Sequence, residues 1–101
     1  MEKSNMVLRS VILRGNDGFS ALCLDTDVAS DGLTLDEAKE NLREAMELYV
    51  GSAIENNLPI IRPVPREDNP LLSKSADVVE DFALNVNLQI TIHLEDPRDR
   101  A

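Results

Sequence analysis

The sequence predicts an α+β domain in which one amphipathic helix packs on an antiparallel sheet of three to four strands, in β-β-β-α-β order. Three observations predict it. Two short apolar runs flank a Gly-Asn-Asp-Gly turn, a central segment repeats its apolar residues at helical spacing, and a later segment alternates apolar and polar residues. A helix with one apolar stripe must bury it against another element, so the helix and the sheet form two layers.

The first two strands form a hairpin. Residues 6–14 are rich in β-branched and aliphatic side chains, and 19–25 form a second apolar run. Between them, the turn from Gly15 to Gly18 supplies residues that tolerate the positive φ of tight hairpin turns. Apolar residues occur on both sides of the first strand, so we expect it to be covered on both faces or to pair with another subunit. A short third strand is accommodated within 26–32.

The helix spans residues 34–56. Thr34 is a favourable N-cap, and Glu37 stands three residues later to complete a capping box. Gly51 weakens the helix by about 1 kcal/mol relative to Ala, and two asparagines followed by a proline end it. The apolar stripe consists of Ala38, Leu42, Ala45, Met46, Tyr49, Ala53 and Ile54.

The last third of the chain contains a connection and a strand. Four prolines in 59–70 exclude a helix and favour an extended path. Residues 71–83 are ambiguous, because they fit either a short helix capped by Ser75 or the opening of the next strand. Residues 84–94 alternate between apolar and polar, which predicts a half-buried strand with His93 on its polar side.

Composition narrows the classes of function. The chain has 101 residues, with 19 acidic and 10 basic side chains, a net charge of −9, three aromatic residues and no Trp. This balance is unsuited to holding a phosphate backbone or stacking bases. No apolar run is long enough to span a membrane, and the start does not resemble a signal peptide. We therefore expect a cytoplasmic, single-domain protein over 1–101, with its core in 6–94 and an acidic tail at 95–101.

Beyond these patterns, the chain resembles the HicB antitoxin family in a stand-alone form, and the family shares a partial or degenerate ribonuclease H fold. The resemblance covers residues 6–66, and 84–94 fits the family's closing strand by position. It depends on the combination of Gly18, Phe19, Gly32, the run Thr34-Leu35-Asp36-Glu37-Ala38, Asn41, Glu44, Ala45, Leu58-Pro59, Pro63 and Pro65.

The resemblance implies a binding protein that neutralises a small, basic, RNA-cleaving HicA-type toxin by protein–protein contact. Ribonuclease H catalysis needs metal-binding carboxylates, one of them on the first strand, and residues 6–14 contain none. His93 has no catalytic partner placed by pattern, and Cys23 is interpreted as a small buried apolar residue. We expect no enzyme activity and no cofactor.

The negative charge is local. Residues 15–61 carry ten acids and two bases, a net of 10 − 2 = 8 negative charges. Three aspartates in 25–31 lack the ligand alternation and closing Glu of a calcium loop, so we expect no metal site. The acidic region faces either solvent or a basic protein. The candidate partner-binding residues are Asp25, Asp27, Asp31, Glu40, Glu44 and Glu47.

Two further expectations concern association. Residues 67–83 are too short and too acidic for the DNA-binding segment of many HicB proteins, and the chain ends seven residues after the predicted last strand, so we expect no DNA binding. The alternative function is a stand-alone homo-oligomer with a structural or regulatory role and no toxin. A small sheet leaves open edges, so we expect a dimer or tetramer that pairs through 7–13 or 84–94.

Overall fold

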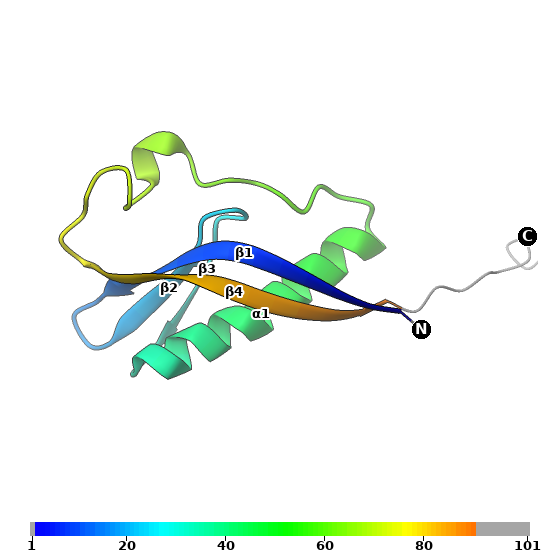
Figure 1. Cartoon of the computed structure of the whole chain (residues 1–101), viewed down its shortest axis with the longest axis horizontal. Helices are drawn as coiled ribbons and strands as arrows, with labels where there is room; N and C mark the ends of the chain where they lie inside the picture. The colour runs from blue at the N-terminus through cyan, green and yellow to red at the C-terminus, as the bar shows by residue number, and fades with distance from the viewer. Residues whose placement is uncertain (1, 91–101) are drawn as a thin grey trace, which may run out of the picture.

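The computed structural model describes residues 2–90 and contains a four-stranded antiparallel sheet with one long helix, which confirms the predicted fold class (Figure 1). The sheet order is β3-β2-β1-β4. None of the helices in these residues is long and apolar enough to cross a membrane. Along the chain, the elements are β1 (Glu2–Arg14), β2 (Phe19–Cys23), β3 (Val28–Gly32), α1 (Leu35–Glu55), the short 3-10 helix η1 (Arg66–Asp68) and β4 (Val78–Ile90).

The main core lies between α1 and one face of the sheet. From the sheet it receives Leu8, Ile12, Ala21, Cys23, Leu84 and Val86. From α1 it receives Ala38, Leu42, Met46 and Val50, and Ala53 is buried on the same helix. The predicted stripe was wrong at two positions, because it included Ile54, which is 46% exposed, and omitted Val50, which is fully buried. A spacing of about 3.6 residues per turn carries the buried line from Met46 through Val50 to Ala53 and leaves Ile54 on the side.

A smaller apolar cluster covers the opposite face of the sheet. Val11, Leu24 and Val64 are its buried members. The proline-containing segment is held there by two backbone hydrogen bonds, from the N–H of Arg62 to the oxygen of Asp25 and from the N–H of Val64 to the oxygen of Leu24, each 2.9 Å long. The prediction that the first strand is covered on both faces is therefore confirmed at Val11, while Val7 stays exposed.

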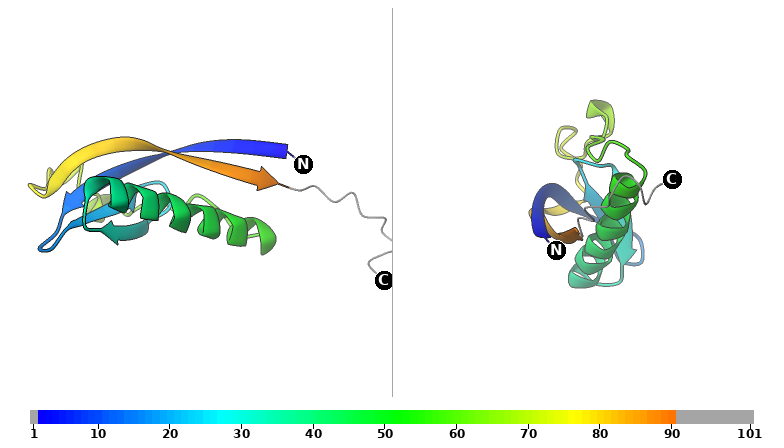
Figure 2. Two further views of the ribbon diagram at one scale, coloured as in Figure 1. Left: turned by 90° about the horizontal axis from the view of Figure 1, so that it is seen from below. Right: turned by 90° about the vertical axis from the view of Figure 1, so that its right-hand side faces the viewer.

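The long strands β1 and β4 form a twisted ribbon over α1 (Figure 2). Their register pairs Glu2 with Ile90 and Leu8 with Leu84. β1 begins at Glu2, earlier than the predicted residue 6. β4 begins at Val78, so the ambiguous stretch 71–83 contains the opening of the next strand and not a short helix. The hydroxyl of Ser75 accepts the N–H of Asp77 at 3.2 Å rather than capping a helix.

The two segments predicted to pair with another subunit lie in β1 and β4, which occupy different places in the sheet. β1 is an inner strand, whereas β4 is at the edge and has one side without a partner strand in the described residues. β1 lies between β2 and β4 over residues 10–13. The expectation that 7–13 pairs with another subunit is wrong there, because β2 and β4 already pair with both edges. Part of the second candidate segment, 91–94, lies outside the described residues.

Close backbone packing joins the β1–β2 turn, the end of β3 and the start of α1. A Cβ atom on Gly18 would lie 2.5 Å from the carbonyl oxygen of Gly32, and one on Gly32 would lie 2.4 Å from the nitrogen of Ala38. The expectation of positive φ in this turn was wrong, since among the described residues only Asp27, Asn57 and Lys74 have positive φ. Gly18 and Gly32 are needed because nothing larger fits.

Substitution of two glycines by Ala should have opposite effects on stability. Gly32→Ala forces backbone apart where α1 meets β3, so we expect a loss of roughly 2 kcal/mol or more in the free energy of unfolding. Gly51→Ala adds a methyl group to an exposed helical site with nothing within 4 Å, and should gain about 0.5–1 kcal/mol. Urea denaturation of dilute protein measures both. Equal effects of the two substitutions would contradict the packing described here.

Ser10 offers a second test of the core. Its side chain is 1% exposed, and its hydroxyl has no hydrogen-bond partner in the described part of the chain. Ser10→Ala removes a desolvated hydroxyl, so we expect unchanged stability or a gain of up to about 1 kcal/mol. In the matched variant Thr26→Ala, a buried hydroxyl that donates to the sulfur of Met46 at 3.3 Å is lost, and stability should fall. Thermal unfolding of both variants distinguishes the two cases.

Candidate functional site

The structure places the six predicted partner-binding residues in two groups. Asp25 and Asp27 lie in the β2–β3 connection and Asp31 lies in β3, whereas Glu40, Glu44 and Glu47 lie on α1. One flank of α1 faces β3, because the side-chain amide of Asn41 donates to the backbone oxygen of Asp31 at 2.8 Å. The other flank faces β4, because Lys39 pairs with Glu80 at 2.8 Å and stacks on the ring of Phe82. The helix thus covers one face of the sheet and makes side-chain contacts with both outer strands, β3 and β4.

The start of α1 is fixed as the sequence predicts. The hydroxyl of Thr34 accepts the N–H of Glu37 at 3.1 Å, and the carboxylate of Glu37 accepts the N–H of Leu33 at 3.3 Å. These contacts satisfy backbone groups that have no partner within the helix.

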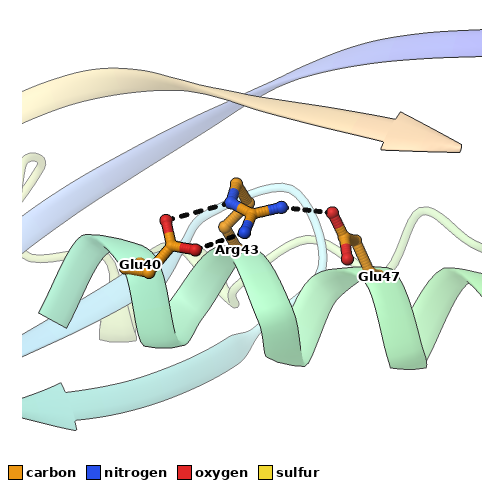
Figure 3. A network of polar contacts seen from close by, with 3 residues as sticks. All are labelled: Glu40, Arg43 and Glu47. Carbon is orange, nitrogen blue, oxygen red and sulfur yellow. Dashed lines mark hydrogen bonds and ion pairs between the residues drawn. The ribbon is translucent and has the colours of Figure 1, made fainter. Parts of the chain in front are cut away.

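Two of the three predicted glutamates are already paired within the chain (Figure 3). Arg43 lies between Glu40 and Glu47 and forms ion pairs with both. Its Nε also donates to Glu40 at 3.0 Å. The hydrogen bond from Arg43 holds the pKa of Glu40 below its ordinary value, and the same contact raises the pKa of Arg43. These three residues therefore present one net negative charge rather than two.

The aspartates have different local roles. The carboxylate of Asp25 accepts the backbone N–H of Arg9 at 2.8 Å, so it ties the connection to β1. The carboxylate of Asp31 accepts the hydroxyl of Ser20 at 2.6 Å across the β2–β3 pair. Asp27 is exposed and adopts a φ of 60°, which Asp tolerates better than most residues. Asp25 and Asp31 are therefore structural as well as acidic.

Sequence reasoning missed an acidic hollow at one end of the molecule. It has a volume of about 410 Å³ and lies where the β1–β2 turn, the end of β3 and the start of α1 meet. Its lining includes the acids Asp17, Asp31 and Glu37 and the apolar residues Phe19 and Leu33, the last of which is 72% exposed. A hollow with carboxylates and an apolar wall suits a long cationic side chain, whose stem is apolar and whose head is charged.

Other candidate chemistry is not assembled in the described residues. Within 2–90, no group of three or more His, Cys, Asp or Glu side chains is placed to hold a metal ion. Cys23 is a free thiol buried in the core, as expected from its apolar neighbours. His93 lies outside the described residues.

Comparison with known proteins identifies the fold. No family model matches the chain, and no curated protein matches it. The crystal structure of the N-terminal domain of Burkholderia pseudomallei antitoxin HicB is similar with a TM-score of 0.54 and 20% identity, and the match covers 86% of this chain and 100% of that one. The fold is that of the HicB N-terminal domain. A chain from the HicA3 and HicB3 toxin–antitoxin complex matches with a TM-score of 0.53, 18% identity and the same coverages.

The ion pairs of Arg43 predict a specific dependence on pH. Because the pKa of Glu40 is lower in the folded chain than its ordinary value, the interaction contributes stability above the unfolded-state pKa and loses it as the pH falls through the folded-state pKa. Arg43→Gln should raise the pKa of Glu40 toward its ordinary value and reduce the loss of stability on acidification. Carboxyl NMR titration of Glu40 measures this. Arg66→Gln, which changes an arginine in η1, is the control and should leave that titration unchanged.

Proposed function

We propose that this chain is a HicB-like antitoxin-type protein that neutralises a small, basic, RNA-cleaving HicA-type toxin by protein–protein contact. The observation that carries the proposal is the match to the complete N-terminal domain of a HicB antitoxin. The similar chain from a toxin–antitoxin complex supports it. The proposed activity is binding, without catalysis by this chain.

The charge distribution supports a basic partner. The region of residues 15–61 with its net of eight negative charges forms the β1–β2 turn, β2, β3 and α1. A surface of one sign accelerates encounter with a partner of the opposite sign and disfavours other partners. The toxin would meet this surface through its own Lys and Arg side chains.

Within this region, the acids differ in how available they are to a partner. Glu40 and Glu47 share the charge of Arg43, and Asp25 and Asp31 accept hydrogen bonds from within the chain. Five acids of the region are exposed and form no ion pair or hydrogen bond within residues 2–90, namely Asp17, Asp27, Asp36, Glu44 and Glu55. Asp17 lines the acidic hollow, and Glu44 lies one turn from Glu40 on α1. We therefore propose that the acidic hollow with Asp17, together with Glu44, contributes most to toxin binding, and that Asp27, Glu40 and Glu47 contribute to the surrounding field.

Charge reversal tests this assignment. In a strain arrested by a small basic toxin encoded next to this chain, co-expression of the wild type should restore growth. The double variant Asp17→Lys/Glu44→Lys should lose rescue, and its association rate with the toxin at low salt should fall by about tenfold or more. The measurement is growth together with stopped-flow or surface-plasmon association.

A matched control carries the same change of charge elsewhere. Glu67→Lys/Asp68→Lys alters two exposed acids of η1, which lie outside the acidic region, and should keep rescue and most of the association rate. Circular dichroism confirms that both double variants fold. Persistent growth arrest with the wild-type chain would rule out the function, whereas equal loss in both variants would rule out only the assigned surface.

A further inference from the structure

A second hollow lies on the face of the sheet opposite α1, where the connection before β4 passes over β1 and β4 (Figure 1). Its volume is about 240 Å³, and we name it the sheet-face hollow. Its charged lining residues are Arg9 and Asp81, and Leu24, Leu71 and Ala83 supply apolar surface. It therefore combines one cationic and one anionic side chain with an aliphatic wall.

The strand register brings the two charged side chains to the same side of the sheet. Arg9 is directly opposite Ala83, and Asp81 is directly opposite Val11. Because side chains alternate along a strand, Arg9 and Val11 lie on one face of β1, and their partners on β4 lie on that same face. Arg9 and Asp81 are therefore diagonal neighbours, about 7–8 Å apart at the backbone.

The backbone of Arg9 is fixed, whereas its charged end is available. Its N–H donates to the carboxylate of Asp25 at 2.8 Å, and its oxygen accepts the N–H of Leu24 at 2.8 Å. Within residues 2–90, neither the guanidinium of Arg9 nor the carboxylate of Asp81 forms an ion pair. Two opposite charges thus line one hollow, and each lacks a charged partner in the described chain.

This combination of groups selects a zwitterion. Asp81 repels an anion and Arg9 repels a cation, whereas a molecule that carries both charges pairs with each. The apolar wall suits an aliphatic group, and the volume is below the roughly 300–1,000 Å³ of most small-molecule sites. An α-amino acid carries a carboxylate, an ammonium and a side chain on one carbon, so its three groups match the three kinds of lining.

We propose that the sheet-face hollow binds a free α-amino acid with an aliphatic side chain. The guanidinium of Arg9 pairs with the carboxylate of the ligand through two parallel hydrogen bonds. Asp81 accepts hydrogen bonds from the ammonium, and the aliphatic group lies against Leu24 and Leu71. The site shares no lining residue with the acidic hollow, so the inference does not depend on the proposed function.

The first experiment titrates the full chain alone with leucine and measures binding by calorimetry. Leucine should bind with a dissociation constant of about 1 mM or below. Two analogues each lack one charge: 4-methylpentanoate has no ammonium, and 3-methylbutylamine has no carboxylate. Each should bind at least about tenfold more weakly than leucine, because one charge of the hollow is then left unpaired. Equal binding of either analogue would overturn the zwitterion assignment.

The second experiment removes each charge of the hollow in turn. Arg9→Gln and Asp81→Asn should each raise the dissociation constant for leucine by about tenfold or more. Arg66→Gln and Asp68→Asn make the same chemical changes at exposed residues of η1, and they should bind leucine like the wild type. Thermal unfolding confirms that all four variants fold. Equal binding by the wild type and both hollow variants would contradict the proposal.

Amide NMR shifts locate the ligand without any substitution. Leucine should move the amide signals of Leu71 and Ala83, which line the hollow, and leave that of Gly51 on α1 unchanged. No saturable binding of leucine up to about 10 mM, or shifts confined to α1, overturns the proposal. No toxin is present in these measurements, so their failure leaves the proposed function untouched.

Discussion

The structure depends on the burial of two consecutive residues of β1 on opposite faces of the sheet. Val11 and Ile12 are both fully buried. Since successive side chains of a strand point to opposite faces, each needs its own cover. Ile12 is covered by α1 and Val11 by the segment that contains Val64. One central strand therefore requires both a helix and a second covering element, although the domain is small.

The proline-rich connection meets this requirement at low cost. A chain rich in proline loses less conformational entropy on folding and does not need a ladder partner for every residue. It makes two backbone bonds to the β2–β3 connection, where Asp25 in turn binds the N–H of Arg9. Asp25, which the charge distribution assigns to a partner-binding surface, is thus also a structural link between β1 and the proline-rich connection that covers it. Charge reversal at Asp25 would therefore disturb the fold as well as the surface charge.

Local sequence patterns correctly predicted α1 and most of the strand residues that face the core, because capping and periodicity depend on residues that are close together in the sequence. Thr34 and Glu37 form the predicted capping contact. These patterns failed where the structure depends on pairing between strands that are far apart in the sequence. Residues 2–5 are polar and carry no strand pattern, yet they pair with the far end of β4. The site shows the same division. Composition finds the acids of α1 but not the ion pairs of Glu40 and Glu47 with Arg43. It also misses the meeting of Asp17, Asp31 and Glu37 from three elements at one hollow.

Charge and exposed apolar surface are separated along α1. The helix has 21 residues, which at 1.5 Å per residue gives a length of about 30 Å. The acidic hollow adjoins its first turn, and the exposed side chains of Ile54, Leu58 and Ile61 lie at or beyond its last turn. A basic partner that docks at the acidic hollow therefore leaves these apolar side chains uncovered, because the two surfaces lie toward opposite ends of the helix.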